Sequence, residues 1–298
     1  MEWNAYFSLQ NHFNLLNLDL LCIGHVCHDL KSNGSVTLGG TTSYCSLMAQ
    51  HLGLNTGILT SYGDDFLFEQ IFTSNRIAIT NKESKFTTLF ENSYEGEYRI
   101  QTLHKRAEVI HPADVPKDWL NTSIVKFCTI ADEVDFQCLK MFPNSLVAAT
   151  IQGWLREWND QGIVSPKEID WSLLEPIDII FMSVDDIQGF ESAIPRLSQL
   201  VSILIITDGS NPACVYENGK KQKFPSYPAT IIDPTGAGDT FAISFLYHYH
   251  NEQKVKDAVI FAHAAASLII EKVGVDIPSV ADINQRFKDY FRIYPEYK

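Results

Sequence analysis

The chain has 298 residues, 45% of them hydrophobic and 20% charged, and its 23 basic and 36 acidic residues give a formal net charge of −13. This apolar content excludes a disordered chain and permits a large buried core. The acidic balance argues against a nucleic-acid partner, which needs clustered Lys and Arg, and no apolar stretch approaches the roughly 20 residues of a membrane helix.

Short apolar runs alternate with longer amphipathic stretches along most of the chain. Residues 18–24 and 56–62 predict buried strands, and residues 43–52 between them predict a helix. Four further strands are expected at residues 125–130, 146–151, 177–182 and 201–207, and two further helices at residues 240–249 and 255–272. Strands separated by stretches long enough for helices indicate βαβ units around a parallel sheet, and the predicted class is therefore α/β.

Two segments of mixed polarity interrupt this alternation of predicted strands and helices. Residues 31–38 contain Asn33-Gly34, a pair that favours a tight hairpin turn, and residues 85–110 mix polar and apolar positions. We expect both to form antiparallel hairpins that pair as a small sheet outside the main one. Because no Pro-, Gly- or Ser-rich linker marks a second domain, residues 1–298 are expected to form a single domain. The small sheet would then be discontinuous, with strands from about 30–40 and 85–110.

The six cysteines are scattered through apolar runs and form no C-x-x-C pair. That distribution is typical of buried thiols in a reduced compartment. The first twenty residues carry no Lys or Arg and no uninterrupted apolar run, so no secretory signal is expected. We therefore expect a cytoplasmic protein, and residues 1–17 add an N-terminal segment for which the sequence indicates no role.

The strongest chemical signal is the string Asp233-Pro-Thr-Gly-Ala-Gly-Asp239-Thr-Phe, between the β-branched residues 230–232 and an apolar helix. A strand–turn–helix arrangement is expected here. Residues 236–238 are small, so a phosphate can approach their N–H groups at a helix start, where unpaired donors and the helix dipole favour an anion. Asp239 falls in the first turn. It is either a helix-stabilising carboxylate or a base that takes a proton from a hydroxyl attacking a phosphoryl group.

This string resembles the C-terminal signature of the ribokinase-like, or PfkB, family of carbohydrate kinases. Further resemblances follow in the family's order along nearly the whole chain. They are residues 24–29, the pair Gly39-Gly40, residues 207–209 and residues 274–278. The resemblance implies a three-layer αβα sandwich with a small β-sheet lid. It also implies transfer of the γ-phosphoryl group of ATP to a hydroxyl of a small polyol, inositol or sugar.

The resemblance also implies roles for individual residues. Asp239 would be the catalytic base, and the anion hole would be formed by Gly236, Ala237 and Gly238. The acceptor would be held by Asp29, Gly39, Gly40 and Thr42, since one carboxylate can accept hydrogen bonds from two hydroxyls. The ATP site would be formed by Thr207, Gly209, His263, Val273 and Gly274. Asp186 matches a carboxylate that organises Mg²⁺ and phosphate, and Asp233 and Thr235 match positions that hold a monovalent cation such as K⁺ in many relatives.

The sequence departs from the family pattern near both substrates. Pro212 lies in the nucleotide loop, where a second Gly is usual and a proline removes a backbone donor. Ser183 and Asp186 occupy the positions of an Asn and a Glu. Thr41 and the residues after it follow Gly40, where ribokinase-type sequences place an Asn that touches ribose. Ribose is therefore not the expected acceptor.

The stretch Gln152-Gly-Trp-Leu-Arg156 resembles an element of the inositol kinase-like subgroup of the family. Gln152 would bind ring hydroxyls and Arg156 would face phosphate. Alternatively, both residues shape a turn and pair with surface acids.

Two other functions remain open. A nucleoside acceptor is an alternative, because Phe90, Tyr98 and Trp154 would supply stacking surfaces unless they are ordinary packing residues. A catalytically silent, kinase-shaped binding or regulatory protein is the other alternative, motivated by the departures from the family pattern. The edges of the lid would also pair between subunits, which predicts a homodimer.

Overall fold

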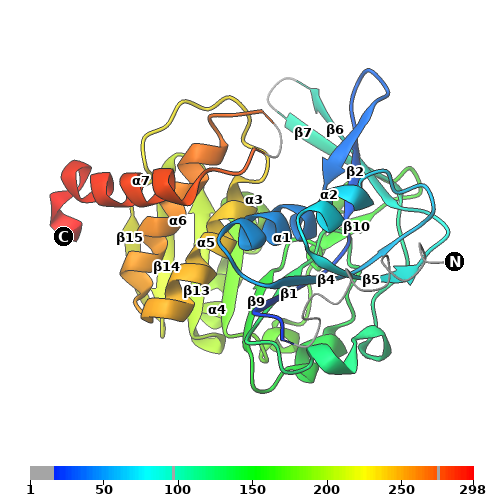
Figure 1. The fold of residues 1–298 in the computed structure, drawn as a ribbon, viewed down its shortest axis with the longest axis horizontal. Coiled ribbons are helices and arrows are strands. Elements are labelled where there is room, and N and C mark those ends of the chain that lie inside the picture. The colour runs from blue at the N-terminus through cyan, green and yellow to red at the C-terminus, as the bar shows by residue number, and fades with distance from the viewer. Residues whose placement is uncertain (1–16, 96–97, 274–275) are drawn as a thin grey trace, which may run out of the picture.

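The computed structural model describes residues 17–95, 98–273 and 276–298. A nine-stranded sheet lies at its centre, with the order β15-β14-β13-β12-β9-β8-β1-β4-β5 (Figure 1). Its strands are β1 (Leu20–Ile23), β4 (Thr56–Tyr62), β5 (Ala78–Glu83), β8 (Ile124–Cys128), β9 (Leu146–Thr150), β12 (Ile179–Ser183), β13 (Ile203–Asp208), β14 (Asn211–Glu217) and β15 (Lys220–Phe224). The strands from β13 to β5 run parallel, as their spacing predicts, whereas β14 and β15 add an antiparallel hairpin at one edge.

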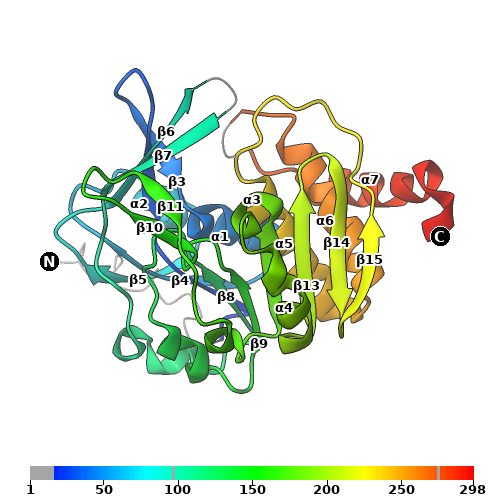
Figure 2. The ribbon, with the colours of Figure 1, turned by 180° about the vertical axis from the view of Figure 1, so that it is seen from behind.

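Helices cover both faces of this sheet and complete the three-layer α/β sandwich (Figures 1 and 2). One face carries α1 (Thr41–His51), α2 (Glu69–Ser74), α5 (Ala237–Glu252), α6 (Val255–Ile269) and α7 (Val280–Ile293). In the described part of the chain, the other face carries only short elements, namely α3 (Val184–Ile187), α4 (Ile194–Leu200) and the 3₁₀ helices η1 (Pro112–Asp114), η2 (Lys117–Trp119), η3 (Phe136–Met141), η4 (Trp171–Leu174) and η5 (Glu191–Ala193). The last turn, η6 (Pro295–Tyr297), follows α7. Within the described residues, every helix is too short or too polar to cross a bilayer.

Strand β8 shows how the sequence divides the core between the two faces. Ile124 and Cys128 pack on the side of α5 and α6, whereas Val125 and Phe127 pack on the opposite side, because successive side chains of a strand alternate. Lys126 lies between Ile124 and Cys128 and is fully buried. A charged residue therefore occupies a core position on the side that carries α5.

A second, four-stranded sheet projects from one end of the main sheet (Figure 1). Its order is β3-β2-β6-β7, with β2 (Cys27–Leu30), β3 (Val36–Gly39), β6 (Thr88–Glu95) and β7 (Tyr98–Lys105). Each of the two predicted hairpins is antiparallel, and β2 joins them by pairing parallel with β6. Gly34, in the first hairpin, adopts a φ of 80° that suits a tight turn. Strands β10 (Arg156–Trp158) and β11 (Val164–Pro166) form a two-stranded sheet beside β7.

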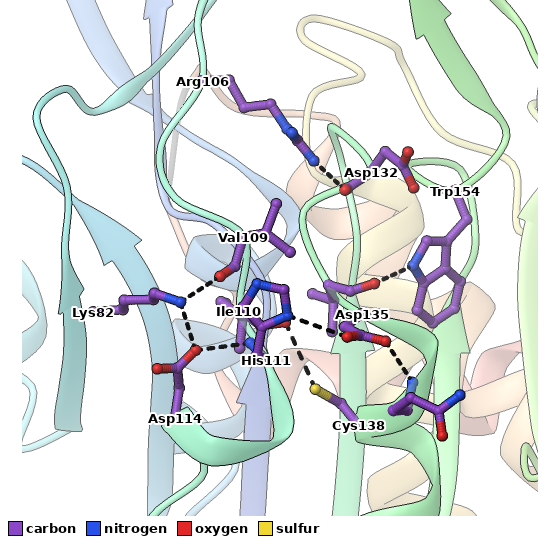
Figure 3. A network of polar contacts seen from close by, with 12 residues as sticks. Lys82, Arg106, Val109, Ile110, His111, Asp114, Asp132, Asp135, Cys138 and Trp154 are labelled. Atoms are coloured by element: carbon purple, nitrogen blue, oxygen red, sulfur yellow. Dashed lines mark hydrogen bonds and ion pairs between the residues drawn. The ribbon is translucent and has the colours of Figure 1, made fainter.

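Polar contacts fix the segment through which β7 rejoins the main body (Figure 3). Arg106 Nε donates a hydrogen bond of 2.7 Å to the Ala131 carbonyl oxygen. Lys82 Nζ, from β5, donates to the Val109 carbonyl oxygen at 2.7 Å and to the Asp114 carboxylate at 2.8 Å. The small sheet is thus anchored beside the carboxyl ends of the parallel strands.

The β-branched residues 230–232 do not form the expected strand. Ile231 and Ile232 are 57% and 58% exposed. The N–H groups of Ile232 and Asp233 both donate to the Ile270 carbonyl oxygen, at 2.8 and 3.1 Å, and so are bonded to the end of α6 and to no neighbouring strand. Strand propensity depends on side-chain packing against neighbouring strands, and no strand of the described residues pairs with this connection.

Candidate active site

A cleft of about 930 Å³ lies between the small sheet and the start of α5. Segments far apart in the sequence line it, from β2, α1 and β6 to the ends of β12 and β13 and the loop before α5. Several of these segments follow the carboxyl ends of parallel strands, where open α/β sheets bind ligands.

The start of α5 brings a glycine-rich turn to the cleft. Gly236 is the N-cap residue with a left-handed φ of 78°, and a Cβ on it would lie 2.4 Å from Tyr44 Cδ1. The N–H of Ala237 donates to the Pro234 carbonyl oxygen at 3.2 Å, so the expected role of this amide in an anion hole is not supported. Within the described chain, the N–H groups of Gly236 and Gly238 have no protein acceptor. Two backbone donors therefore point to a ligand at a helix N-terminus.

Asp239 lies in the first turn of α5, as predicted, and lines the cleft as a half-buried carboxyl. Burial raises its pKa from 3.8 to about 7, and the nearby Cys128 contributes to the increase. Lys126 and a hydrogen bond from the Thr41 side chain oppose the increase in pKa. A carboxyl group with a pKa near neutrality can both accept and release a proton at physiological pH.

The Gly39-Gly40 pair shapes the opposite wall. An added Cβ on Gly39 would lie 2.5 Å from Asp29 Oδ2, so only glycine leaves room for this carboxylate beside β3. Gly40 has a φ of 92° and forms the N-cap of α1. Asp29 and Gly40 both line the cleft. Gly39 does not line the cleft, and its part is to leave room for the Asp29 carboxylate.

A chain of polar side chains runs along the cleft from β10 to the start of α1. Arg156 Nη2 donates to Gln152 Oε1 at 2.9 Å, and Gln152 Nε2 donates to Thr41 Oγ1 at 3.1 Å. All three residues line the cleft. Thr42, the residue predicted from the sequence, is instead fully buried and lies outside the lining. Successive helix positions differ by about 100° in direction, and the start of α1 at Gly40 determines that Thr41 faces the cleft.

Two of the residues expected at the ATP site are in the cleft. Thr207 lies near the end of β13 with its hydroxyl donating to the Met182 carbonyl oxygen at 3.3 Å, and Gly209 follows in the turn to β14 with a φ of 52°. The departure Pro212 lies within β14, beyond that turn.

The other expected ATP-site residues are elsewhere. His263 is buried between α5 and α6, its ring centroid 5.0 Å from that of Phe241, and burial lowers its pKa to about 4. It does not line the cleft, and its position is that of a neutral core residue. Val273 is 78% exposed and also lies outside the lining. Gly274 falls outside the described residues.

Asp186 and Thr235 line the cleft, whereas Asp233 does not. Asp186 Oδ2 accepts hydrogen bonds of 2.8 Å from both the N–H and the hydroxyl of Ser183, which caps α3. Asp233 Oδ1 accepts from the Thr235 N–H at 3.0 Å. In the described part of the chain, no three His, Cys, Asp or Glu side chains converge as metal ligands. One or two carboxylate oxygens at a phosphate site nevertheless fit Mg²⁺, which keeps most of its ligands as water and phosphate.

The aromatic candidates differ in their positions. Phe90 lines the cleft from β6. Trp154 is fully buried, and its indole N–H donates to the Val134 carbonyl oxygen at 2.7 Å, so it is a packing residue. The Tyr98 side chain lies outside the described part.

Comparison with known proteins agrees with this architecture. Residues 17–282 match the family described as pfkB family carbohydrate kinase. The inositol 3-kinase of Arabidopsis thaliana is 25% identical over 273 residues, which cover 87% of this chain and 75% of that protein. The nucleoside kinase of Methanocaldococcus jannaschii is 24% identical over 308 residues, covering 91% and 97%.

The fold is also found among solved structures. A pyrophosphate-dependent kinase in the ribokinase family, solved as a sulfate complex, matches with a TM-score of 0.77 at 17% identity, over 90% of this chain and 99% of that one. This similarity confirms the predicted ribokinase-like fold. The match over residues 17–282 shows that the chain belongs to the pfkB family of carbohydrate kinases, enzymes that transfer a phosphoryl group to an alcohol.

Proposed function

We propose that the protein transfers the γ-phosphoryl group of ATP to a hydroxyl of inositol or of a similar small polyol or sugar. One observation carries the proposal: a carboxyl group with a pKa of about 7, Asp239, lies in one cleft with the backbone N–H groups of Gly236 and Gly238, which have no acceptor among the described residues. Asp239 accepts the proton of the acceptor's hydroxyl group. The hydroxyl oxygen forms a bond to the γ-phosphorus of ATP while the bond between that phosphorus and the leaving oxygen of ADP breaks. The two amides stabilise the negative charge of the transferring group.

The donor side takes the phosphates of ATP. We assign Thr207 and Gly209 to phosphate contacts and Asp186 to Mg²⁺, which supplies charge neutralisation on the phosphates when bound. Asp233 and Thr235 are assigned to a monovalent cation such as K⁺ beside the anion loop. A solved structure with the same fold is that of a pyrophosphate-dependent kinase, so both donors belong in the assay.

Hydroxyl recognition favours a polyol on the acceptor side. Asp29 accepts hydrogen bonds, and Gln152 and Thr41 offer both donors and acceptors. The similarity to the inositol 3-kinase supports an inositol. A nucleoside is the second candidate, because the ring of Phe90 lines the same cleft and one relative is a nucleoside kinase.

The small sheet serves as a lid in this proposal. Its closure excludes water from the transferring group and so limits ATP hydrolysis. Strand β3 lies at the free edge of the small sheet, and we propose that a second copy of the chain pairs along the lid. Sedimentation of the purified protein would test this homodimer.

ADP release measured over a panel of inositols, sugars and nucleosides tests the function. We expect at least one polyol to raise ADP release well above the Asp239→Asn variant, and phosphorylated product is measured in parallel with pyrophosphate as donor. If no acceptor exceeds that control with either donor, the alternative of a silent binding protein replaces the kinase.

The raised pKa of Asp239 predicts the pH dependence of the reaction. A base works only when it is deprotonated, so kcat/KM should fall about tenfold per pH unit below a pH of about 7 and level off above it. Initial rates from pH 5 to 9 at constant ionic strength measure this. A plateau extending down to pH 5 would show that the base is another group.

Asp29→Ala should impair the acceptor selectively. Loss of a charged acceptor of hydroxyl hydrogen bonds should raise the KM for the polyol by about 10- to 100-fold, whereas the Kd for ATP should stay within about twofold. Kinetics for the acceptor and calorimetry for ATP separate the two. Asp29→Asn serves as the matched variant, and its KM for the polyol should lie between those of the wild type and Asp29→Ala. Equal loss of both affinities would contradict the assignment of Asp29 to the acceptor.

A further inference from the structure

Lys126 is a buried lysine that the proposed reaction does not use. It lies in the centre of β8, between Cys22 of β1 and Ala148 of β9 in the sheet register, and it is 0% exposed. Lysine is almost never fully buried unless its ammonium is paired. A lysine that keeps its charge in the middle of a parallel sheet therefore needs a compensating partner.

The ammonium group of Lys126 lies directly beneath the cleft. Nζ is 2.5 Å from Thr150 Oγ1, 3.3 Å from the Phe127 carbonyl oxygen and 5.0 Å from the ring centroid of Phe181. Thr150 and Phe181 both line the cleft, as does Asp239. One layer of side chains thus separates the ammonium from the space where the substrates meet.

No carboxylate of the described residues lies within 4.0 Å of Lys126 Nζ, in contrast to Lys82, which pairs with Asp114 at 2.8 Å. The direct partners of Lys126 are a hydroxyl, a carbonyl and an aromatic face, all of them uncharged. Compensation for the buried charge must therefore act over a longer distance, and a low-dielectric interior transmits such an interaction well.

Asp239 lines the same cleft as Thr150 and Phe181, and its carboxylate can provide this compensation. The charge of Lys126 acts on the Asp239 carboxyl and lowers its pKa against the larger effect of burial. Both groups belong to the side of the sheet that carries α5, and Cys45 Sγ of α1 reaches the Asp239 carbonyl oxygen at 3.8 Å from the same layer.

We propose that Lys126 is a positioning residue of the kinase, whose ammonium holds Asp239 ionised from beneath the cleft floor so that it can take the acceptor's proton. The inference rests on the proposed function, in which Asp239 is the base. Without this cation, the partly desolvated carboxyl group of Asp239 would keep its own proton up to a higher pH and could not accept another below that pH.

Other titratable groups surround Asp239. They are Cys128 on β8, Cys22 on β1, Cys27 on β2, Tyr44 and Cys45 on α1, and Asp186 on α3. Lys126 is the one cation among the groups that affect the pKa of Asp239 most strongly. Lys126 also lowers the pKa of Cys128, and the charge of Cys128 raises the pKa of Asp239. Each midpoint of the Asp239 titration is therefore also measured in a Cys128→Ser background, in which the loss of Lys126 should move that midpoint upward.

Lys126→Met tests the proposal, because methionine keeps most of the length of the side chain and removes the charge. The titration of the Asp239 carboxyl is followed by infrared difference spectroscopy and assigned by its loss in Asp239→Asn. The wild-type midpoint should be at a pH of about 7, and Lys126→Met should raise it by about one unit or more. Lys82→Met removes a lysine anchored outside the lining of the cleft (Figure 3) and should leave the midpoint unchanged.

The pH–rate profile gives a second readout. The acid limb of kcat/KM should move upward by the same amount in Lys126→Met, so that for a shift of one unit the rate at pH 7 falls about fivefold and recovers almost fully at pH 9. Lys126→Gln, which also lacks the charge, should show the same shift if Lys126→Met folds poorly. An unshifted carboxyl midpoint in a folded variant would overturn the proposal. The titration needs no turnover, so an inactive wild type would refute the proposed function while the midpoint still decides the role of Lys126.

Discussion

Asp239→Asn is expected to lower kcat by about 10²- to 10⁴-fold, the range in which a positioned general base contributes. Asparagine keeps the shape of the side chain at the start of α5 but cannot accept the hydroxyl proton. Binding of the nucleotide should change little, since the backbone donors of Gly236 and Gly238 remain. Single-turnover ADP formation with a polyol acceptor measures the loss. A variant retaining more than about a tenth of the activity would contradict the role of Asp239 as base.

The same substitution should stabilise the fold above neutral pH. The folded pKa of about 7 lies above the ordinary value of 3.8, so between these pH values the folded chain binds more protons than the unfolded chain. The folded chain therefore becomes less stable as the pH rises through about 7, because the stabilisation that the protonated Asp239 provides is lost. An asparagine side chain does not lose stability in this way, and the free energy of unfolding of Asp239→Asn should exceed that of the wild type by up to about 4 kcal/mol at pH 8 and by little at pH 4. Urea unfolding at both pH values measures it.

Gly236→Ala is expected to remove most activity by distorting the anion loop. The φ of 78° is strained for alanine, and the new Cβ would lie 2.4 Å from Tyr44 Cδ1. Either the ring or the turn must move, and a displaced donor at a developing negative charge costs about 10²- to 10³-fold in kcat. The strain should also lower the free energy of unfolding by about 1 to 2 kcal/mol.

Gly34→Ala is the matched control for this prediction. Gly34 has nearly the same backbone conformation, with a φ of 80°, but nothing lies within 4 Å of its added Cβ. It lies in the β2–β3 turn outside the lining of the cleft. It should show a similar loss of stability with kcat unchanged. If both variants lose kcat equally, the contact with Tyr44 is not what keeps the anion loop in place.

Much of this architecture could be predicted because the decisive signals are local. Fully apolar runs such as that of β1 predict strands buried on both faces, and a helix start after small residues predicts the position of Asp239. Strand β15, Lys220–Phe224, was not predicted, since four of its five residues are polar and exposed at the sheet edge. For residues 230–232 a strand was predicted and none is present, because β-branched residues form a strand only where a neighbouring strand is available.

The errors within the site arise from long-range geometry. Which of Thr41 and Thr42 faces the cleft depends on where α1 begins and how it packs on the sheet. The core position of His263 depends on the contact of α6 with α5. Lys126 gives no sequence signal at all, since one lysine in an apolar strand looks like an exposed edge residue until both neighbouring strands are in place.

The assembly of the cleft also bears on how the protein is made. Helix α1 belongs to the first quarter of the chain, yet α5, which packs against it and carries Asp239, begins only at residue 237. A nascent polypeptide emerging from the ribosome therefore holds one apolar surface of its sheet uncovered through most of translation, a state prone to aggregation. Such distant pairing slows folding, and phosphoryl transfer can begin only after synthesis has passed α5.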